Sequence, residues 1–238
     1  MFNRVPAQKL QWLALALLLV YPIAILLARL GVMHFRNSFL MFVIAALIGF
    51  VVLVISLLKL TKEHTQVKPL TLAIAFTLAP LMVLGSNIIK SKAYPFIHDI
   101  STDLIDPPEF VIAAKLRGPE DHSVVYEGSD VAKQQQQGYP DIQSLILAST
   151  PEQTLAKVKA IIHENGWALL GEKSDGLPFY VEAMDTSLLF GFKDDVVVRI
   201  KAAANGSLVD IRSMSRQGKS DLGVNAERIR SIREQLAL

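Results

Sequence analysis

Cysteine is absent from the 238-residue chain. The absence excludes disulfides, zinc-thiolate sites, iron-sulfur clusters and thiol nucleophiles. Acidic residues are almost absent from the first 98 positions, which hold nine Lys or Arg and one Glu, whereas the rest of the chain holds fifteen Lys or Arg and twenty-one Asp or Glu. An acidic second half lacks the basic surface that nucleic acids require, so we expect no nucleic-acid partner.

Apolar sequence, in contrast, is abundant. Hydrophobic residues make up 51% of the chain and the mean hydropathy is +0.37, which exceeds the values of an ordinary soluble domain. Three runs are each long enough to cross a hydrocarbon core: Leu10 to Leu30, Ser38 to Leu60 and Pro69 to Ile89. The first run has a basic flank like that of a signal peptide, but two more spans follow it. We therefore predict that residues 1–92 form three transmembrane helices, with the lipid bilayer as their partner.

Positive charges in the loops predict the orientation of these helices. With a cytoplasmic amino terminus, the inner side carries Arg4, Lys9, Lys59, Lys62 and Lys68, and the outer side carries Arg29, Arg36, Lys90 and Lys92. This five-to-four bias favours a cytoplasmic amino terminus for a multi-pass protein, and three spans would then place everything after Ile89 on the outer face of the membrane. The charged residues within the spans are Arg29 and Lys59, and each lies next to a span end, so an anchoring role is favoured over transport.

The remaining chain divides into a connector and a folded domain. Residues 93–143 are predicted to form an extended connector with short helices, because Pro107 and Pro108 interrupt it. Residues 144–238 begin with a strong helix signal. Thr150 is expected to cap the helix, and the side chain of Gln153 is expected to bond back to the Thr150 backbone in a capping box. Four strand signals and a last helix follow, at residues 167–173, 177–187, 189–201, 207–216 and 224–236. The predicted fold class is α+β, an antiparallel four-stranded meander flanked by helices.

The last hairpin carries opposing charges. If Asn205 and Gly206 form a two-residue turn, Lys201 stands opposite Asp210 and Arg199 stands opposite Arg212. Because like charges opposite each other destabilise a sheet, an anion is expected beside the two arginines. The domain's own carboxylates would make a structural network, which we favour, and the alternative is a bound anionic group held by guanidinium forks.

Two sets of candidate site residues follow from this hairpin and from the loop before the last helix, where helix N–H groups attract anions. The candidate ligand-binding residues are Arg199, Arg212, Arg216, Lys219, Ser213 and Ser215. The candidate structural network consists of Asp194, Asp195, Asp210, Asp221 and Asn225. In the loop, helix capping by Ser220 or Asp221 is the favoured reading over anion binding.

The same residues carry a resemblance to a known family. The strings GFKDDVVVRI and VDIRSMSRQGKSDLGVNAERIR resemble the signature of the bacterial DUF1499 family, in the form with amino-terminal transmembrane helices. IHDISTDLIDPP and GYPDIQSL are similar to its upstream elements, and the similarity covers about residues 96 to 236. The resemblance implies a compact α+β domain, often attached to membrane spans in bacterial envelopes, with no established activity and no catalytic residue to carry over.

The sequence contains no motif that is specific to a known reaction. The five histidines are scattered without a second ligand at helical spacing, and no serine lies in a nucleophile elbow, so we expect neither a metal site nor a cofactor. Whether the protein is an enzyme stays open, with a non-enzymatic role favoured. The first hypothesis is a membrane-anchored envelope protein whose periplasmic domain binds a small anionic or amphiphilic ligand or a partner protein. The alternatives are an envelope hydrolase or transferase, with Asp195, Asp210 and Ser213 or Ser215 converging, and a purely structural membrane subunit.

Overall fold

The computed structural model describes residues 5–62 and 64–238. The chain forms two compact units, one of residues 1–92 with 188–191 and the other of residues 93–187 with 192–238. Arg4, which contributes to the predicted orientation, lies outside the described residues.

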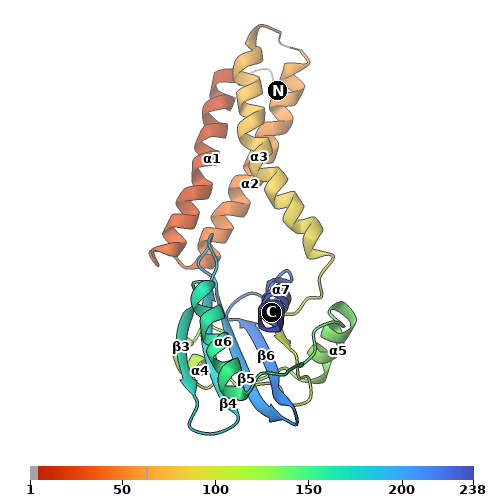
Figure 1. Cartoon of the computed structure of the whole chain (residues 1–238). Coiled ribbons are helices and arrows are strands. Elements are labelled where there is room, and N and C mark those ends of the chain that lie inside the picture. Colours follow the sequence, from red (N-terminus) through yellow and green to blue (C-terminus); the bar gives the residue numbers. More distant parts are fainter. Residues whose placement is uncertain (1–4, 63) are drawn as a thin grey trace. The chain divides into compact units, whose positions relative to one another are not determined.

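Three long helices make up the first unit, as predicted (Figure 1). They are α1 (Ala7–Arg29), α2 (Phe35–Leu60) and α3 (Val67–Ser91), and all three are long and apolar enough to cross a membrane. Small side chains such as Ala14 and Ala73 lie between the helices and allow them to approach closely. The buried hydroxyl of Thr77 donates to the carbonyl of Ala73 over 2.8 Å, so this polar group is satisfied within its own helix.

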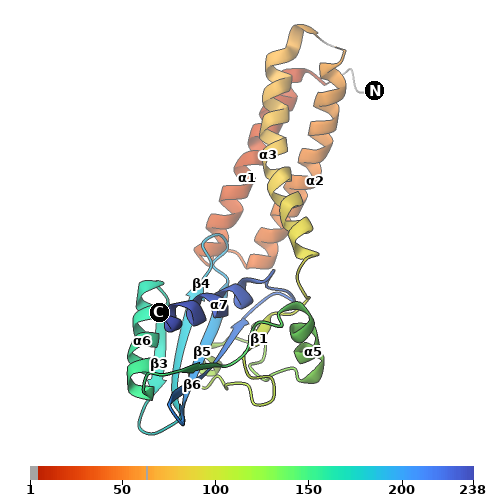
Figure 2. The ribbon, with the colours of Figure 1, turned by 45° about the vertical axis from the view of Figure 1, so that its right-hand side comes forward.

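The second unit is built on an antiparallel sheet (Figure 2). The predicted four-stranded meander is present as β3 (Ala168–Lys173), β4 (Phe179–Thr186), β5 (Lys193–Ala203) and β6 (Gly206–Ser215). Two short strands, β1 (Asp99–Ser101) and β2 (Leu145–Leu147), also pair with β6. Strands of three residues are too short to show an alternating pattern in the sequence, which is why neither was predicted.

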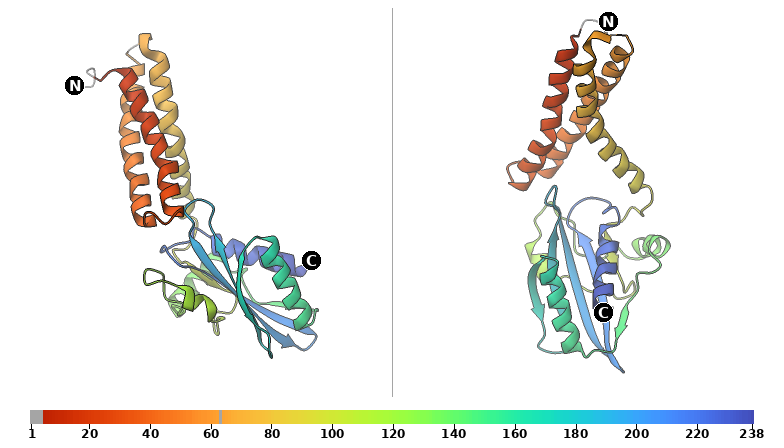
Figure 3. Two further views of the ribbon diagram at one scale, coloured as in Figure 1. Left: turned by 90° about the vertical axis from the view of Figure 1, so that its left-hand side faces the viewer. Right: turned by 45° about the horizontal axis from the view of Figure 1, so that its top comes forward.

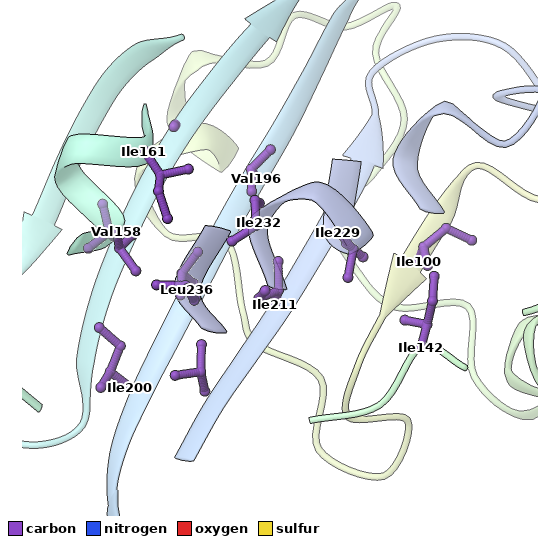
Figure 4. Close-up of a cluster of buried hydrophobic side chains, with 14 of the residues drawn as sticks. Ile100, Ile142, Val158, Ile161, Val196, Ile200, Ile211, Ile229, Ile232 and Leu236 are labelled. Carbon is purple, nitrogen blue, oxygen red and sulfur yellow. The ribbon is translucent and has the colours of Figure 1, made fainter. Parts of the chain in front are cut away.

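Helices cover one face of the sheet and the chain before them covers the other (Figure 3). On the first face lie α6 (Pro151–Glu164), which begins with the predicted capping box, and α7 (Val224–Ala237). Figure 4 shows how Val158 and Ile232 from these helices meet Val196 and Ile211 from the strands. The second face carries α4 (Ile112–Leu116) and packs Phe110 on Met214. A further helix, α5 (Ser129–Gly138), also lies in the segment expected to be a connector.

The register of the last hairpin differs from the prediction. Arg199 pairs with Asp210, Val197 pairs with Arg212, and the two-residue turn is Ala204 and Asn205. The predicted opposition of Arg199 and Arg212 is therefore wrong, because the ladder is displaced by two residues. A displacement of two preserves the faces, so the valines and isoleucines still point towards the helices as predicted.

Candidate ligand pocket and buried ionic network

The two short strands leave a gap along the outer edge of β6. β1 pairs with residues 212–214 and β2 with residues 207–209, so Asp210 and Ile211 lie between them. Thr102 fills the gap, since its backbone N–H donates to the carbonyl of Ile211 and its hydroxyl accepts from the Ile211 N–H at 2.8 Å. The chain after β1 and the chain before β2 therefore meet at Asp210.

Arg199 is the centre of the charge cluster at this gap. Its Nε and Nη2 donate to Oδ2 of Asp210 at 3.0 and 2.8 Å, and it also bonds Asp103 at 3.0 Å and Asp106 at 2.8 Å. Lys201 adds a second cation 3.4 Å from Asp210. Burial lowers the pKa of Arg199, but the hydrogen bonds and charges of Asp210 and Asp106 outweigh it and raise that pKa above its ordinary value. The guanidinium is thus permanently charged and fully engaged.

A pocket of about 410 Å³ opens beside this cluster. Its lining residues come from three segments and are Thr102, Asp103, Leu104, Ile105, Gln135, Gln136, Tyr139, Pro140, Ile142, Gln143 and Ser144. Two of them reach the buried ions, because Asp103 bonds Arg199 and the Ser144 hydroxyl donates to Asp210 at 2.5 Å. The size lies within the range of small-molecule sites.

The pocket walls are held by specific bonds. The Gln135 side chain accepts from the backbone N–H of Ser101 at 3.0 Å and donates to its carbonyl at 2.6 Å, as a neighbouring strand would. Asp103 accepts the N–H groups of Ile105 and Asp106, both at 3.0 Å, which fixes a tight turn. The pocket is therefore formed by ordered backbone.

Arg212 lies away from the pocket in its own site. It forms two parallel bonds with Asp99, at 2.9 and 2.7 Å, and donates to the carbonyls of Pro108 and Val124. The rings of Phe110 and Tyr126 lie 5.0 and 5.3 Å from the guanidinium carbon. The burial of Tyr126, together with the charge of Asp99, raises the pKa of Tyr126 to about 12.

Arg216 shares one carboxylate with Arg117. Asp195 is completely buried and accepts from Arg216 at 2.8 Å and from Arg117 Nε at 2.9 Å. The two arginines also donate to carbonyls of the segment around α4. This carboxylate therefore fastens that segment to the sheet.

The candidate serines lie on the opposite face, beneath α7. Ser213 donates to Asn225 at 2.6 Å, and Asn225 donates to Ser215 at 3.0 Å and to the His98 carbonyl at 3.0 Å. Arg228 completes the group by donating to Ser213 at 2.9 Å and to Asp194 at 2.8 Å. Every member has a partner within the domain.

The two remaining candidate residues, Asp221 and Lys219, lie in the loop before α7 and differ in their contacts. Asp221 accepts the N–H groups of Gly223, the N-cap residue of α7, and of Asn225, both at 2.9 Å. Burial raises the pKa of the Asp221 carboxyl. Lys219 is exposed and makes no ion pair within the described part of the chain. No bound anion is needed to explain this loop.

The arrangement required for a hydrolase is not assembled by these residues. Asp195 and Asp210 point to one face of the sheet, while Ser213 and Ser215 point to the other, so they share no cleft. Across residues 5–62 and 64–238, no group of three or more His, Asp or Glu is arranged to hold a metal ion. The best-defined chemical feature is the pocket next to Arg199.

Sequence reasoning missed most of the pocket. The run of four glutamines at residues 134–137 matches no motif, yet Gln135 and Gln136 line the wall. A signal was present, because Thr102 to Ile105 lie in the string IHDISTDLIDPP and Tyr139 to Ser144 lie in GYPDIQSL. Both strings resemble upstream elements of the family, and the structure brings them together.

Fold and site define a class of protein: an α+β domain with a pocket at the edge of its sheet, preceded by three helices suited to a membrane. The family described as "Protein of unknown function (DUF1499)" matches residues 99–236. The match covers more than half of the chain, and the protein belongs to this family. No curated protein and no solved structure matches.

Proposed function

We propose that the protein is a membrane-anchored component of the bacterial envelope whose α+β domain binds a small amphiphilic molecule. The observation that supports this proposal is the pocket beside Arg199, which is the right size for a small ligand and is lined by both polar and apolar groups. Because the site residues form no nucleophile and base, the proposed role is binding without catalysis.

The lining indicates the chemistry of the ligand. Leu104, Ile105 and Ile142 offer apolar surface, whereas amides and hydroxyls offer hydrogen bonds. Among the described residues that line the pocket, Asp103 alone is charged, and Arg199 balances its charge. An anionic ligand would have to displace a carboxylate from Arg199, so the geometry favours a neutral or weakly cationic amphiphile over an anion.

The proposed location is the periplasmic side of the inner membrane. It is supported by the five-to-four bias of basic residues, which favours a cytoplasmic amino terminus. Three spans, an odd number, would then carry the domain to the opposite side. The absence of cysteine allows a direct test with Asn205→Cys in the exposed β5–β6 turn. A membrane-impermeant maleimide should label this variant in intact spheroplasts, and labelling only after lysis would contradict the location.

The ligand proposal is tested by native mass spectrometry of the full-length protein purified in detergent. Gln136→Trp fills the mouth of the pocket from an exposed lining position on α5, and Lys133→Trp places the same ring on α5 away from the lining. We expect a small molecule or lipid to co-purify with the wild type and with Lys133→Trp, and to be lost from Gln136→Trp.

Both variants should resist protease as the wild type does, since both positions are exposed. Equal retention of the bound species by the two tryptophan variants would refute the pocket as the binding site. A folded wild type that carries no bound species would favour the purely structural role, for which the pairing of Arg199, Arg212 and Arg216 with internal carboxylates is the supporting observation.

A further inference from the structure

The connection between β4 and β5 is unusually apolar. Residues 187–192 read SLLFGF, and the side chains of Leu188 and Leu189 are 83% and 59% exposed. The loop is well formed, because the Ser187 N–H donates to the carbonyl of Phe192 at 2.8 Å and its hydroxyl accepts from the Phe192 N–H at 2.9 Å. Two leucines are therefore presented to solvent on an ordered hairpin.

The strand register places this hairpin at the end of the sheet where the chain arrives from the third helix. Asp99, the first residue of β1, pairs with Met214 near the end of β6, and Met214 pairs with Asp195 near the start of β5. Asp194 in turn pairs with Asp185, two residues before Ser187. The entry of the chain and the apolar hairpin thus share one end of the sheet.

The loop between β6 and α7 lies at the same end. Leu222 and Val224 are exposed there, and a side chain on Gly223 would come within 2.7 Å of Tyr94 in the incoming chain. Two exposed lysines accompany the apolar groups, Lys193 at the start of β5 and Lys219 before α7. Apolar tips flanked by cations are typical of surfaces that enter the interface of an anionic bilayer.

Nearby carboxylates do not cancel these cations. Asp185 and Asp194 both pair with Arg228, and Asp221 accepts backbone N–H groups at the start of α7. The turns at the opposite end of the sheet are the polar Ser174 to Gly176, which Leu177 follows at 48% exposure, and the short Ala204 and Asn205.

The chain length brings that end within reach of a membrane. Seven residues lie between the end of α3 at Ser91 and Asp99, and the eight Cα–Cα steps from Ser91 to Asp99 span at most about 28 Å when fully extended. We propose that Leu188 and Leu189, assisted by Leu222, Val224, Lys193 and Lys219, insert this end of the domain into the headgroup region of an anionic phospholipid bilayer. This inference does not depend on the pocket or its ligand.

The test uses the full-length protein in nanodiscs of phosphatidylethanolamine and phosphatidylglycerol. Leu189→Cys and Asn205→Cys provide single labelling sites at the two ends of the sheet, because the wild type has no cysteine. With an environment-sensitive fluorophore, the label at residue 189 should emit at shorter wavelength and be quenched several-fold more by spin-labelled lipid than the label at residue 205. Aqueous iodide should show the reverse order.

Equal iodide quenching at both positions would overturn the proposal, and so would a label at residue 189 that neither iodide nor spin-labelled lipid reaches, because protein would then cover the loop. The role of charge has its own comparison. Lys193→Gln with Lys219→Gln should reduce lipid quenching at residue 189 several-fold, as should replacing phosphatidylglycerol by phosphatidylcholine. Lys133→Gln with Lys157→Gln removes two exposed lysines of α5 and α6 and should leave the quenching unchanged.

Discussion

Arg199 and Asp210 face each other across β5 and β6, and both guanidinium contacts to the carboxylate, at 3.0 and 2.8 Å, are buried. Their pairing resolves the charge conflict predicted from the hairpin, because each arginine of the sheet has its own internal carboxylate. The same pair also borders the pocket through Asp103 and Ser144. Stability and the proposed ligand binding would therefore be coupled at one place in the domain.

Arg199→Met should destabilise the domain by about 3–5 kcal/mol, since the buried Asp210 loses its main partner. Arg199→Met combined with Asp210→Leu should recover most of that loss, because no charge is left unpaired. Urea-dependent proteolysis of the full-length protein in detergent measures both. Lys201→Met serves as the control, and removal of this partly exposed cation should cost less than about 1 kcal/mol. A double variant no more stable than Arg199→Met would contradict this account.

Replacing Arg199 and Arg212 together by Met tests whether these arginines stabilise the domain through the structural network or bind the ligand directly. Their carboxylates are in distinct groups, Asp210 for one and Asp99 for the other, so the losses should add and unfold the domain. Protease resistance and the near-ultraviolet circular dichroism of the purified variant report the fold. A double variant that stays folded but loses its co-purifying species would instead assign the arginines to the ligand.

The elements predicted from the sequence are those with a strong local pattern. Thr150 and Gln153 form the expected capping box, and the valines and isoleucines of β5 and β6 alternate as their burial requires. The register was missed because Asn205 occupies the second turn position and Gly206 begins β6, whereas the Asn-Gly preference predicts both residues inside the turn. Local sequence does not distinguish these alternatives, but the Arg199–Asp210 pair does.

The partners of the candidate arginines were less accessible to prediction. Asp99 and Asp103 are about one hundred positions from Arg212 and Arg199 in the chain, and Arg117 lies 78 positions from Asp195. No periodicity links such distant residues. The pocket has the same origin, because Gln135 and Ser144 meet Thr102 only after β1 and β2 have paired with the edge of β6.

The domain should lose stability as the pH falls below about 6.5, the ordinary pKa of histidine. His98 is buried, and its ring stacks on His122 with the centroids 4.1 Å apart. Burial and the charge of His122 lower the pKa of His98, with a further contribution from Arg117, and these effects outweigh the opposing charges of Glu127 and Asp99. The unfolded chain therefore binds a proton at His98 more readily than the folded domain does. The stability is fully present above the ordinary pKa of histidine and is lost as the pH falls from that value towards the lowered pKa of His98.

The contribution of His98 is isolated by comparing variants between about pH 7.5 and about pH 5. His98→Gln should flatten the dependence of the urea midpoint on pH, whereas His163→Gln, at an exposed position on α6, should leave the slope unchanged. The difference between the two removes the contribution of carboxylates that titrate at lower pH. An unchanged slope in His98→Gln would show that another group causes the dependence.

Comparing Gly206→Ala with Gly176→Ala distinguishes the effect of backbone strain from the effect of a steric clash between the added Cβ and neighbouring atoms. Both glycines have positive φ, +141° and +153°, so each alanine should cost about 1–3 kcal/mol in strain. A Cβ on Gly206 would also lie 1.9 Å from the Leu147 carbonyl oxygen, whereas nothing lies within 4 Å of one on Gly176. Gly206→Ala must therefore open the pairing of β2 with β6, which should displace the adjacent Ser144 and abolish ligand retention in native mass spectrometry. Gly176→Ala should keep the ligand, and equal effects of the two changes would show that the pocket does not depend on β2.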